Sequence, residues 1–458
     1  MAFISALLWT RQAQAIPAFA RQTGLECSAC HFQHFPVLNN FGRAFKAGGY
    51  TMTGSQEKVE GDNNLSIPAV LNGALITSLT YQKTNGTNAA PPSGTSPTST
   101  SNDGALSIPQ SVHLFLGGHV SEHIGFIAES CLEAACTANG GLLSGFKMLF
   151  ISGVKGIKDV QVGAIPFSYG QGGAGVAYSF ELLNTGAAAL HAFNQQDMAT
   201  ISAQQYVAVI GPAGLNSAAS GIALVATHPM GFVNFAKWQS SHFGGGTNGS
   251  PTSNYLRVAA TSAGDLIRGW DIGFGGQIWS GSSVSVSTAA PVAYTENDTE
   301  AYALDAQFLG YVAKMPLTVI ASYATAKGHD PLNPVQNLFN NQTGNIGDPQ
   351  DKSSFNIGAE LGVIPFKATL QAGFRRAKSG VNETGPSPTP GIPGAPIPGT
   401  NAEDDALLIG ATYALAQNVR FTLSYSQYSG SFYSASSIAK SPGGTGDQQT
   451  WLALEADF

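Results

Sequence analysis

"KATLQAGFR", residues 367–375, alternates between apolar and polar side chains along its length. Successive side chains of a β-strand point to opposite faces, so this period of two predicts a strand with one apolar and one polar face. The same alternation recurs in AYALDAQF at 301–308 and in RFTLSYSQY at 420–428. A soluble β-sandwich would show the same period, so the connections between strands must distinguish it from a membrane barrel.

These connections alternate between short turns and long loops. The short turns lie at Val120–His123, Val154–Lys158, Thr227–Met230, Thr261–Leu266, Val312–Pro316, Gly362–Pro365 and Tyr413–Asn418. The long loops are rich in Gly, Pro, Ser, Thr and Asn, and lie at Thr84–Asp103, Ser130–Gly141, Gln239–Ser253, Gly281–Thr299, Ala326–Lys352, Lys378–Ala402 and Ser429–Gln448. Tight turns at one end and long loops at the other are typical of outer-membrane barrels.

The two ends of the predicted barrel settle the strand number. A first strand near Ser66–Gln82 should rise away from the turn end, and the last, TWLALEADF, should return to it and close on Phe458, a terminal aromatic residue typical of outer-membrane barrels. The number is therefore even, and of sixteen or seventeen candidates, with Phe167–Gly214 ambiguous, sixteen is selected. We expect an all-β, sixteen-stranded antiparallel barrel over residues 61–458. Its water-filled lumen would be wide enough to hold a small N-terminal domain.

The composition agrees with a membrane barrel and excludes some classes of protein. Of the 458 residues, 55 are glycine and only 11% are charged, against about 25% in an average soluble protein. No internal stretch approaches the ~20 consecutive apolar residues of a membrane helix. The net charge of −7 argues against nucleic acid as a partner.

Residues 1–15, MAFISALLWTRQAQA, resemble a signal peptide. An apolar run from Phe3 to Trp9 precedes Ala13-Gln14-Ala15, a small-x-small cleavage site. Cleavage there would start the exported chain at Ile16. No basic residue precedes the apolar run, so a translation start further upstream is an alternative.

The N-terminal part, residues 16–60, carries the sequence ECSACH. Cys27, Cys30 and His31 form C-x-x-C-H, the attachment signature of c-type haem. The two thiols add to the haem vinyl groups, and the histidine becomes the proximal iron ligand. A structural zinc site would need four ligands, and no second cysteine pair of suitable spacing follows. A redox C-x-x-C belongs near a βαβ pattern, which is absent. We therefore expect one covalent haem c in a small α-helical cytochrome head.

The segment FPVLNNFGRAFKAGGY predicts a short helix after the haem motif. Pro36 suits its first turn, Gly48-Gly49 suits its end, and an apolar stripe lies between them at helical spacing: Val37, Leu38, Phe41 and Phe45. Met52 follows and is the first candidate for the sixth iron ligand. His34 is the competitor, and the remaining alternatives are a barrel residue (His113, His119 or Met148), water or an open position.

Two further sets of residues are candidate sites. Cys131 and Cys136 lie in a loop-like stretch, SCLEAACTANGG, and an oxidising compartment would favour a disulfide between them. Acidic loop clusters could attract Fe²⁺, because hard oxygen ligands suit a divalent cation. These clusters are Glu296, Asp298 and Glu300, and Glu403, Asp404 and Asp405. Solvated surface charge is the ordinary explanation of both.

The stretch PAFARQTGLECSACHFQHFPVLNNFGRAFKAGGYTMTG, from Pro17 to Gly54, followed by a porin-like barrel, resembles the outer-membrane cytochrome–porin fusions of iron-oxidising bacteria. The resemblance implies a monohaem head at or within a barrel of about sixteen strands. It also implies oxidation of extracellular Fe(II) and transfer of the electron to a periplasmic soluble cytochrome or cupredoxin. Cys27, Cys30 and His31 match the head firmly, and Met52 less so; the barrel matches in architecture only.

Three alternatives remain open. The haem could serve another donor, or send electrons outward. The chain could be a solute porin whose haem head is a plug or sensor, and inward-facing charges such as Asp305, Glu360 and Arg375 agree with this as well. A periplasmic cytochrome fused to a soluble β domain is disfavoured by the alternation of short turns and long loops and by the terminal Phe458.

Overall fold

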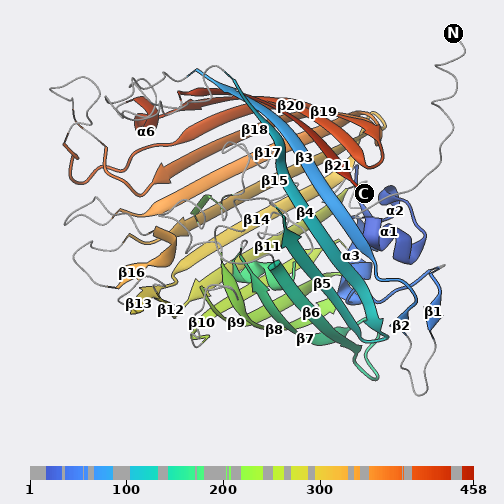
Figure 1. The fold of residues 1–458 in the computed structure, drawn as a ribbon. Helices are drawn as coiled ribbons and strands as arrows, with labels where there is room; N and C mark the ends of the chain where they lie inside the picture. Colours follow the sequence, from blue (N-terminus) through green and yellow to red (C-terminus); the bar gives the residue numbers. More distant parts are fainter. Residues whose placement is uncertain are drawn as a thin grey trace, which may run out of the picture.

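The central feature of the computed structural model is a closed barrel of sixteen antiparallel strands (Figure 1). The structure describes residues 17–33, 37–54, 56–59, 67–85, 104–132, 143–170, 173–179, 203, 206–207, 218–240, 251–262, 270–286, 294–328, 335–340, 350–383, 385, 395–434 and 446–458. Around the barrel the strands are β3 (Gly73–Thr84), β4 (Ala105–Ser121), β5 (Ile124–Cys131), β6 (Leu143–Gly153), β7 (Gln161–Tyr169), β8 (Ala219–His228), β9 (Gly231–Gln239), β10 (Ser253–Thr261), β11 (Asp271–Ser280), β14 (Ala301–Val312), β15 (Met315–Ala326), β17 (Lys352–Ile364), β18 (Ala368–Ser379), β19 (Asp405–Ala416), β20 (Val419–Ser429) and β21 (Gln448–Asp457). The predicted barrel and its strand number are confirmed.

The barrel closes where β21 pairs with β3. The first strand begins at Gly73 rather than near Ser66, and Phe458 exchanges backbone hydrogen bonds with Leu75 at 2.8 and 2.9 Å. The chain therefore enters and leaves the barrel at the end that carries the short turns. We call this the turn end, and the opposite end the loop end.

Short elements occupy parts of the long connections at the loop end (Figure 1). A three-stranded sheet consists of β12 (Ser282–Val286), β13 (Tyr294–Asp298) and β16 (Gln336–Asn337). Other pieces are α6 (Ser431–Ser434) and the 3-10 turns η3 (Ala174–Ala177) and η5 (Leu338–Asn340). The stretch from Phe167 to Gly214, ambiguous in sequence, contains the end of β7 and the η3 turn, and no further barrel strand is found in its described part.

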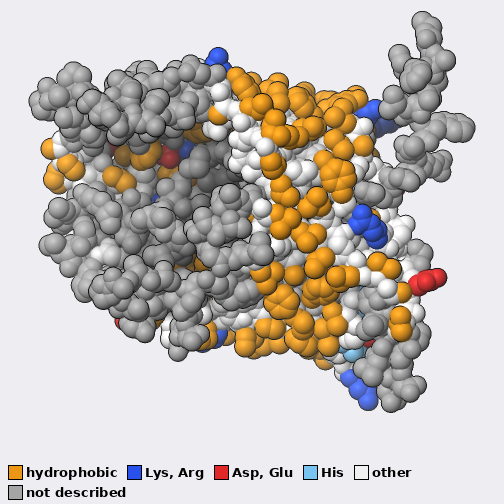
Figure 2. Space-filling model, viewed as in Figure 1, with side chains coloured by type: hydrophobic (Ala, Val, Ile, Leu, Met, Phe, Trp, Pro, Cys, Tyr) orange, Lys and Arg blue, Asp and Glu red, His pale blue; other side chains and the backbone are white. Residues whose placement is uncertain are grey.

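Side chains on the barrel strands point in the direction expected of a membrane protein. On β18, Gln371 and Arg375 are buried inside the barrel, whereas Leu370 is 52% and Phe374 39% exposed on the outside. A water-soluble sandwich would bury its apolar face instead. Apolar side chains form a broad band over the outer wall (Figure 2), as a lipid-facing barrel requires. None of the described helices is long and apolar enough to cross a membrane.

Three small helices form the head at the turn end (Figure 1). They are α1 (Pro17–Thr23), α2 (Cys27–Cys30) and α3 (Asn40–Ala47). The helix predicted from Pro36 begins at Asn40, because the Asn39 side chain caps it by accepting the Gly42 N–H at 3.0 Å. Gly48 and Gly49 follow its last residue, as predicted. β1 (Lys58–Val59) and β2 (Ile67–Pro68) pair with each other and flank the predicted domain boundary at residue 60.

Candidate functional site

The two cysteines of C-x-x-C-H are the first and last residues of α2, a single helical turn. Residues three apart in a helix lie on the same side, so both thiols are presented together. Both are half-buried, and no disulfide joins them. Burial raises the pKa of the Cys30 thiol.

His31 follows directly and is held in an extended conformation. Its backbone N–H donates to the Cys27 carbonyl at 2.9 Å, and its side chain is buried, with 7% exposed. The chain then folds back, because His31 pairs with Leu38 and the Phe32 N–H donates to the Val37 carbonyl at 2.8 Å. Val37 and Leu38 are therefore buried beside the histidine from an extended segment rather than from a helix.

α3 is packed tightly against the cysteine turn. The Asn39 amide donates to the carbonyls of Ser28 and Ala29 at 3.3 and 3.0 Å, and its backbone N–H donates to Cys30 at 3.0 Å. A Cβ on Gly42 would lie 2.2 Å from the Cys30 carbonyl oxygen. Only glycine permits this approach, so Asn39 and Gly42 fix the orientation of the turn that carries both thiols.

The donor set of this turn suits a covalently attached haem. Two thiols on one face and an adjacent buried imidazole are the groups that thioether attachment and proximal ligation need. No group of three or more His, Cys, Asp or Glu side chains that could hold a bare metal ion occurs in the described part of the chain, this turn included. The zinc alternative therefore gains no support from the geometry.

The candidates for the sixth ligand lie in different surroundings. Met52 is 40% exposed, and its carbonyl accepts the Gln22 amide at 2.8 Å. His119, on the inner wall of β4, places Nδ1 2.9 Å from the Thr51 carbonyl, and its buried Nε2 has no hydrogen-bond partner. His113 pairs with Glu129 at 2.8 Å. Met148 is on the outer face, because its neighbours Lys147 and Leu149 are buried inside. His34 lies outside the described residues, so ligation by Met52 stays a prediction.

One side of the head is fastened to β4 and to Asn72, the residue before β3, through Gln22, a fully buried residue. Its amide donates to the carbonyls of Tyr50 and Met52 at 2.6 and 2.8 Å. Its Oε1 accepts the His119 backbone N–H at 3.1 Å and the Asn72 amide at 3.3 Å. One side chain thus ties α1, the segment after α3 and the barrel wall together. Its sequence context, ARQTG, carries no signal of this role.

The other side of the head reaches β11, β15 and β17. Arg43 of α3 forms a salt bridge with Asp271 at 2.5 Å, and the two side chains are 3% and 12% exposed. The Gln33 amide donates to Thr318 Oγ1 and to the Glu360 carbonyl, both at 3.2 Å. β4 and β15 are seven places apart in one direction around the ring of sixteen strands and nine in the other. The head therefore spans the mouth of the barrel at the turn end.

The remaining predicted residues have separate positions. Cys131 takes part in a disulfide bond, and its predicted partner Cys136 lies outside the described residues. The acidic clusters do not assemble as metal sites among the described residues, and four of their carboxylates have basic or backbone partners. Glu300 lies 4.0 Å from Lys327 and Glu403 3.6 Å from Arg376, Asp404 binds Arg375, and Asp405 accepts the Ala377 N–H at 3.3 Å.

The predicted inward-facing charges do point into the barrel, and each has protein partners. Asp305 binds Arg257 at 2.6 Å, with both side chains at 0% exposure. Glu360 accepts hydrogen bonds from Thr369 and Gln371 at 2.6 and 3.2 Å. Arg375 binds Asp404. Such pairing is required because an uncompensated buried charge is strongly destabilising.

No known family model and no curated protein matches the chain. Solved structures do match its shape. A loop-deletion form of OmpT, an outer membrane protein of Vibrio cholerae, is 10% identical, with a TM-score of 0.42 over 85% of this chain and 99% of that one. The outer membrane channel DcaP of Acinetobacter baumannii is 10% identical, with a TM-score of 0.46 over 85% and 97%. A porin is 11% identical, with a TM-score of 0.45 over 85% and 100%.

Proposed function

We propose that the protein is an outer-membrane cytochrome that oxidises extracellular Fe(II) and passes the electron to a periplasmic carrier. In enzymatic terms it would be an Fe(II):cytochrome c oxidoreductase. The observation that carries the proposal is the position of the C-x-x-C-H turn. A haem-attachment motif is clamped by both walls into one mouth of a barrel whose outer surface is apolar.

The orientation of the barrel supports this direction of transfer. In outer-membrane barrels the tight turns face the periplasm and the long loops face outward. The head lies at the turn end, so the haem would be accessible to a soluble periplasmic partner. The half-buried α2 turn is the part of the head where such a partner, a cytochrome or a cupredoxin, would approach. Fe(II) would be oxidised on the side of the loops.

The head residues have distinct roles in this proposal. Cys27 and Cys30 would attach the haem, and His31 would be its axial ligand, with Met52 as the first candidate opposite. When bound, the haem supplies a one-electron redox centre. Arg43 and Asp271 hold the head in a fixed position relative to the barrel, which sets the distance over which the electron must travel.

Stopped-flow absorbance tests the proposal. Purified oxidised holoprotein is mixed with Fe(II), and reduction of the haem is followed by its α-band. Mg(II) has the same charge and no redox chemistry, so it controls for binding alone. We expect rapid reduction with Fe(II) only. A haem that stays oxidised, at a pH where the couple permits transfer, would contradict Fe(II) oxidation and favour another donor or direction.

Sidedness is tested with the holoprotein inserted into liposomes in a known orientation. Fe(II) is added only to the loop side or only to the turn side. The proposal requires reduction of the haem by Fe(II) on the loop side. Reduction by turn-side Fe(II) alone would reverse the assigned direction.

A further inference from the structure

The described residues of the connection between β7 and β8 lie inside the barrel instead of at its rim. Its described residues are Gly173–Ser179, Ala203, Tyr206 and Val207, which we call the strap. Ala174, Tyr178, Ala203 and Tyr206 are all 0% exposed. Loop residues are usually at the surface, so complete burial means that these residues are enclosed by the barrel wall.

One part of the strap is fastened to β6 and β9. The Lys147 ammonium donates to the Val176 carbonyl at 2.9 Å. The Asn234 amide donates to the Tyr178 carbonyl at 3.0 Å, and the Tyr178 and Phe232 ring centroids are 5.1 Å apart. Inward-pointing wall side chains therefore satisfy the backbone of the strap, which a buried loop requires.

The other part of the strap is fastened to β15 and to the β17–β19 region. The Ala203 N–H donates to Ser322 Oγ at 2.8 Å, and the Tyr206 hydroxyl donates to Asp404 Oδ2 at 2.8 Å. The Tyr206 ring also has Arg375 at 4.9 Å and Lys352 at 5.6 Å from its centroid. Cation–π contacts of this kind add to the hydrogen bond, so Tyr206 is the main anchor on this side.

The two sets of anchors are on opposite walls. Between β6 and β15 there are six strands in one direction, β7, β8, β9, β10, β11 and β14, and eight in the other. The described strap residues therefore contact both sides of the lumen. The wall side chains around it are not open to water, since Arg257, Tyr255 and Lys352 are 0% exposed. In an aqueous porin channel such inward-facing polar residues are wet.

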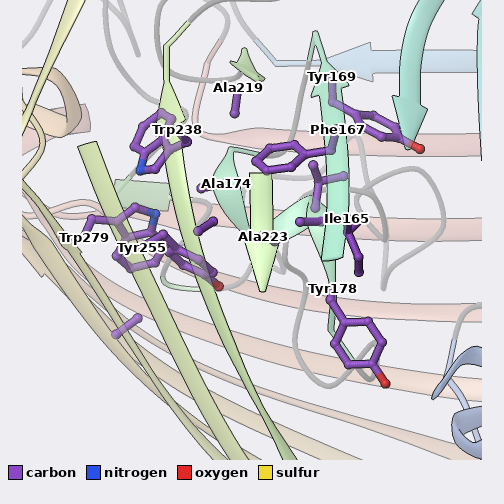
Figure 3. Packing of buried hydrophobic residues seen from close by; sticks show 14 of the residues in the cluster. Ile165, Phe167, Tyr169, Ala174, Tyr178, Ala219, Ala223, Trp238, Tyr255 and Trp279 are labelled. Atoms are coloured by element: carbon purple, nitrogen blue, oxygen red, sulfur yellow. The ribbon is translucent and has the colours of Figure 1, made fainter. Parts of the chain in front are cut away.

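Packing is continuous from the head to the loop end. A single apolar cluster includes Phe45 and Tyr50 of the head, Tyr178 and Tyr206 of the strap, and Trp279 and Phe339 beyond them. Tyr255 and Trp279 have ring centroids 5.2 Å apart, and Trp279 and Phe339 5.8 Å. Figure 3 shows Trp238, Tyr255 and Trp279 on adjacent strands of this wall. An open, water-filled lumen, expected from the strand number, is therefore not seen where the strap and the wall side chains pack together in the described part of the barrel.

We propose that the strap closes the lumen, so that the barrel is not a diffusion pore and solutes from the loop side stop before they reach the head. This goes beyond the proposed function, since it concerns what the barrel excludes. If Fe(II) is the donor, the consequence is that iron stays on the loop side and only the electron crosses packed protein to the head. A solute porin with a haem plug would require the opposite behaviour.

Cysteine labelling of the full-length holoprotein tests the barrier. Thr318 contacts the head and Ser322 contacts the strap, so the period of two places Ile320 on the inner wall between them. Ile320→Cys reports access to that space, and Lys327→Cys, whose native side chain is 72% exposed at the loop end, is the open control. A charged, membrane-impermeant thiol reagent is added from the loop side. We expect labelling at position 320 to be about 100-fold slower than at 327, because it requires local opening.

Variants of Tyr206, which loosen the strap, provide a second test in the same labelling assay. Tyr206→Ala removes the hydroxyl and the ring, whereas Tyr206→Phe removes only the hydroxyl and keeps the ring between the two cations. We expect Tyr206→Ala to speed labelling at position 320 about tenfold, and Tyr206→Phe to have a smaller effect. Resistance of the folded barrel to SDS before heating shows that each variant is folded. Equal labelling at positions 320 and 327 in the otherwise unaltered protein would overturn the barrier. Slow labelling that Tyr206→Ala leaves unchanged would overturn the role of the strap.

Conductance in planar bilayers gives an independent measurement. The holoprotein should show no porin-like conductance steps, and steps typical of an open sixteen-stranded channel would overturn the proposal. Neither readout depends on haem reduction. A closed barrel with no Fe(II) chemistry would therefore contradict the proposed function alone, and an open barrel with fast Fe(II) chemistry would contradict the barrier alone.

Discussion

Asp271→Asn tests how firmly the head is held in the barrel. Arg43 is 3% exposed and lies 2.5 Å from the Asp271 carboxylate, which is 12% exposed. Removing one partner of a buried ion pair costs about 3–5 kcal/mol, because the other charge is left uncompensated. Asp271 is partly exposed, and an asparagine can still accept a hydrogen bond, so we take the lower end. About 3 kcal/mol corresponds to roughly a 100-fold larger population of undocked head.

Hydrogen exchange of the full-length holoprotein in detergent measures this population. Amides of α3 (Asn40–Ala47) should exchange up to about 100-fold faster in Asp271→Asn, if docking is what protects them. Glu455→Gln is the matched control. It breaks the Arg420–Glu455 pair, also 2.5 Å long, on β20 and β21, which is separate from the head contacts of Gln22, Gln33 and Arg43 described above. Unchanged exchange of α3 in Asp271→Asn, or equal acceleration in Glu455→Gln, would refute the role of the Arg43–Asp271 pair in holding the head.

Three other substitutions follow from the structure. Gly42→Ala should destabilise the head by about 1–3 kcal/mol, because its Cβ would lie 2.2 Å from the Cys30 carbonyl. Thermal melting followed by haem absorbance measures this change. The control is Gly48→Ala, which should leave the melting temperature unchanged because the nearest atoms to its Cβ are 3.6 Å away. Replacing Cys27 and Cys30 together with serine should abolish the haem that stays on the chain in SDS gels, and retained stain would disprove thioether attachment. Leu370→Arg, on the outer face, should weaken folding into lipid by about 2–4 kcal/mol if it lies near the bilayer midplane; an unchanged folding free energy would mean that this face does not contact lipid.

The sequence predicted the barrel because each strand can be recognised from its own alternation of apolar and polar residues. The period of two in Lys367–Arg375 identifies two faces, and turn residues at Val312–Pro316 identify a tight connection, without knowledge of the rest of the chain. The same reasoning left Phe167–Gly214 ambiguous. In the described part of that stretch, the carbonyls of Val176 and Tyr178 accept hydrogen bonds from Lys147 and Asn234, which are 29 and 56 residues away, and no local period marks such contacts.

Some residues of the candidate site were likewise predicted from the sequence, and others were not. Spacing alone identifies Cys27, Cys30 and His31, because attachment chemistry requires those residue types next to one another. Gln22, Gln33 and the Arg43–Asp271 pair were not predicted. Arg43 and Asp271 are 228 residues apart, and an arginine on a short helix is ordinarily a solvated charge. Only closure of the barrel brings their side chains together in a place where water is excluded.

The sequence by itself determined the class of barrel and the side that faces lipid, and it predicted the residues that would attach a haem. Each of these follows from chemistry within one strand or one turn. The tertiary structure decided that the head sits across the turn end and that the lumen is packed. A sixteen-stranded ring is wide enough to be open or filled. Which of the two occurs depends on contacts such as that of Tyr206 in the strap with Asp404 on the wall, made by residues 198 positions apart.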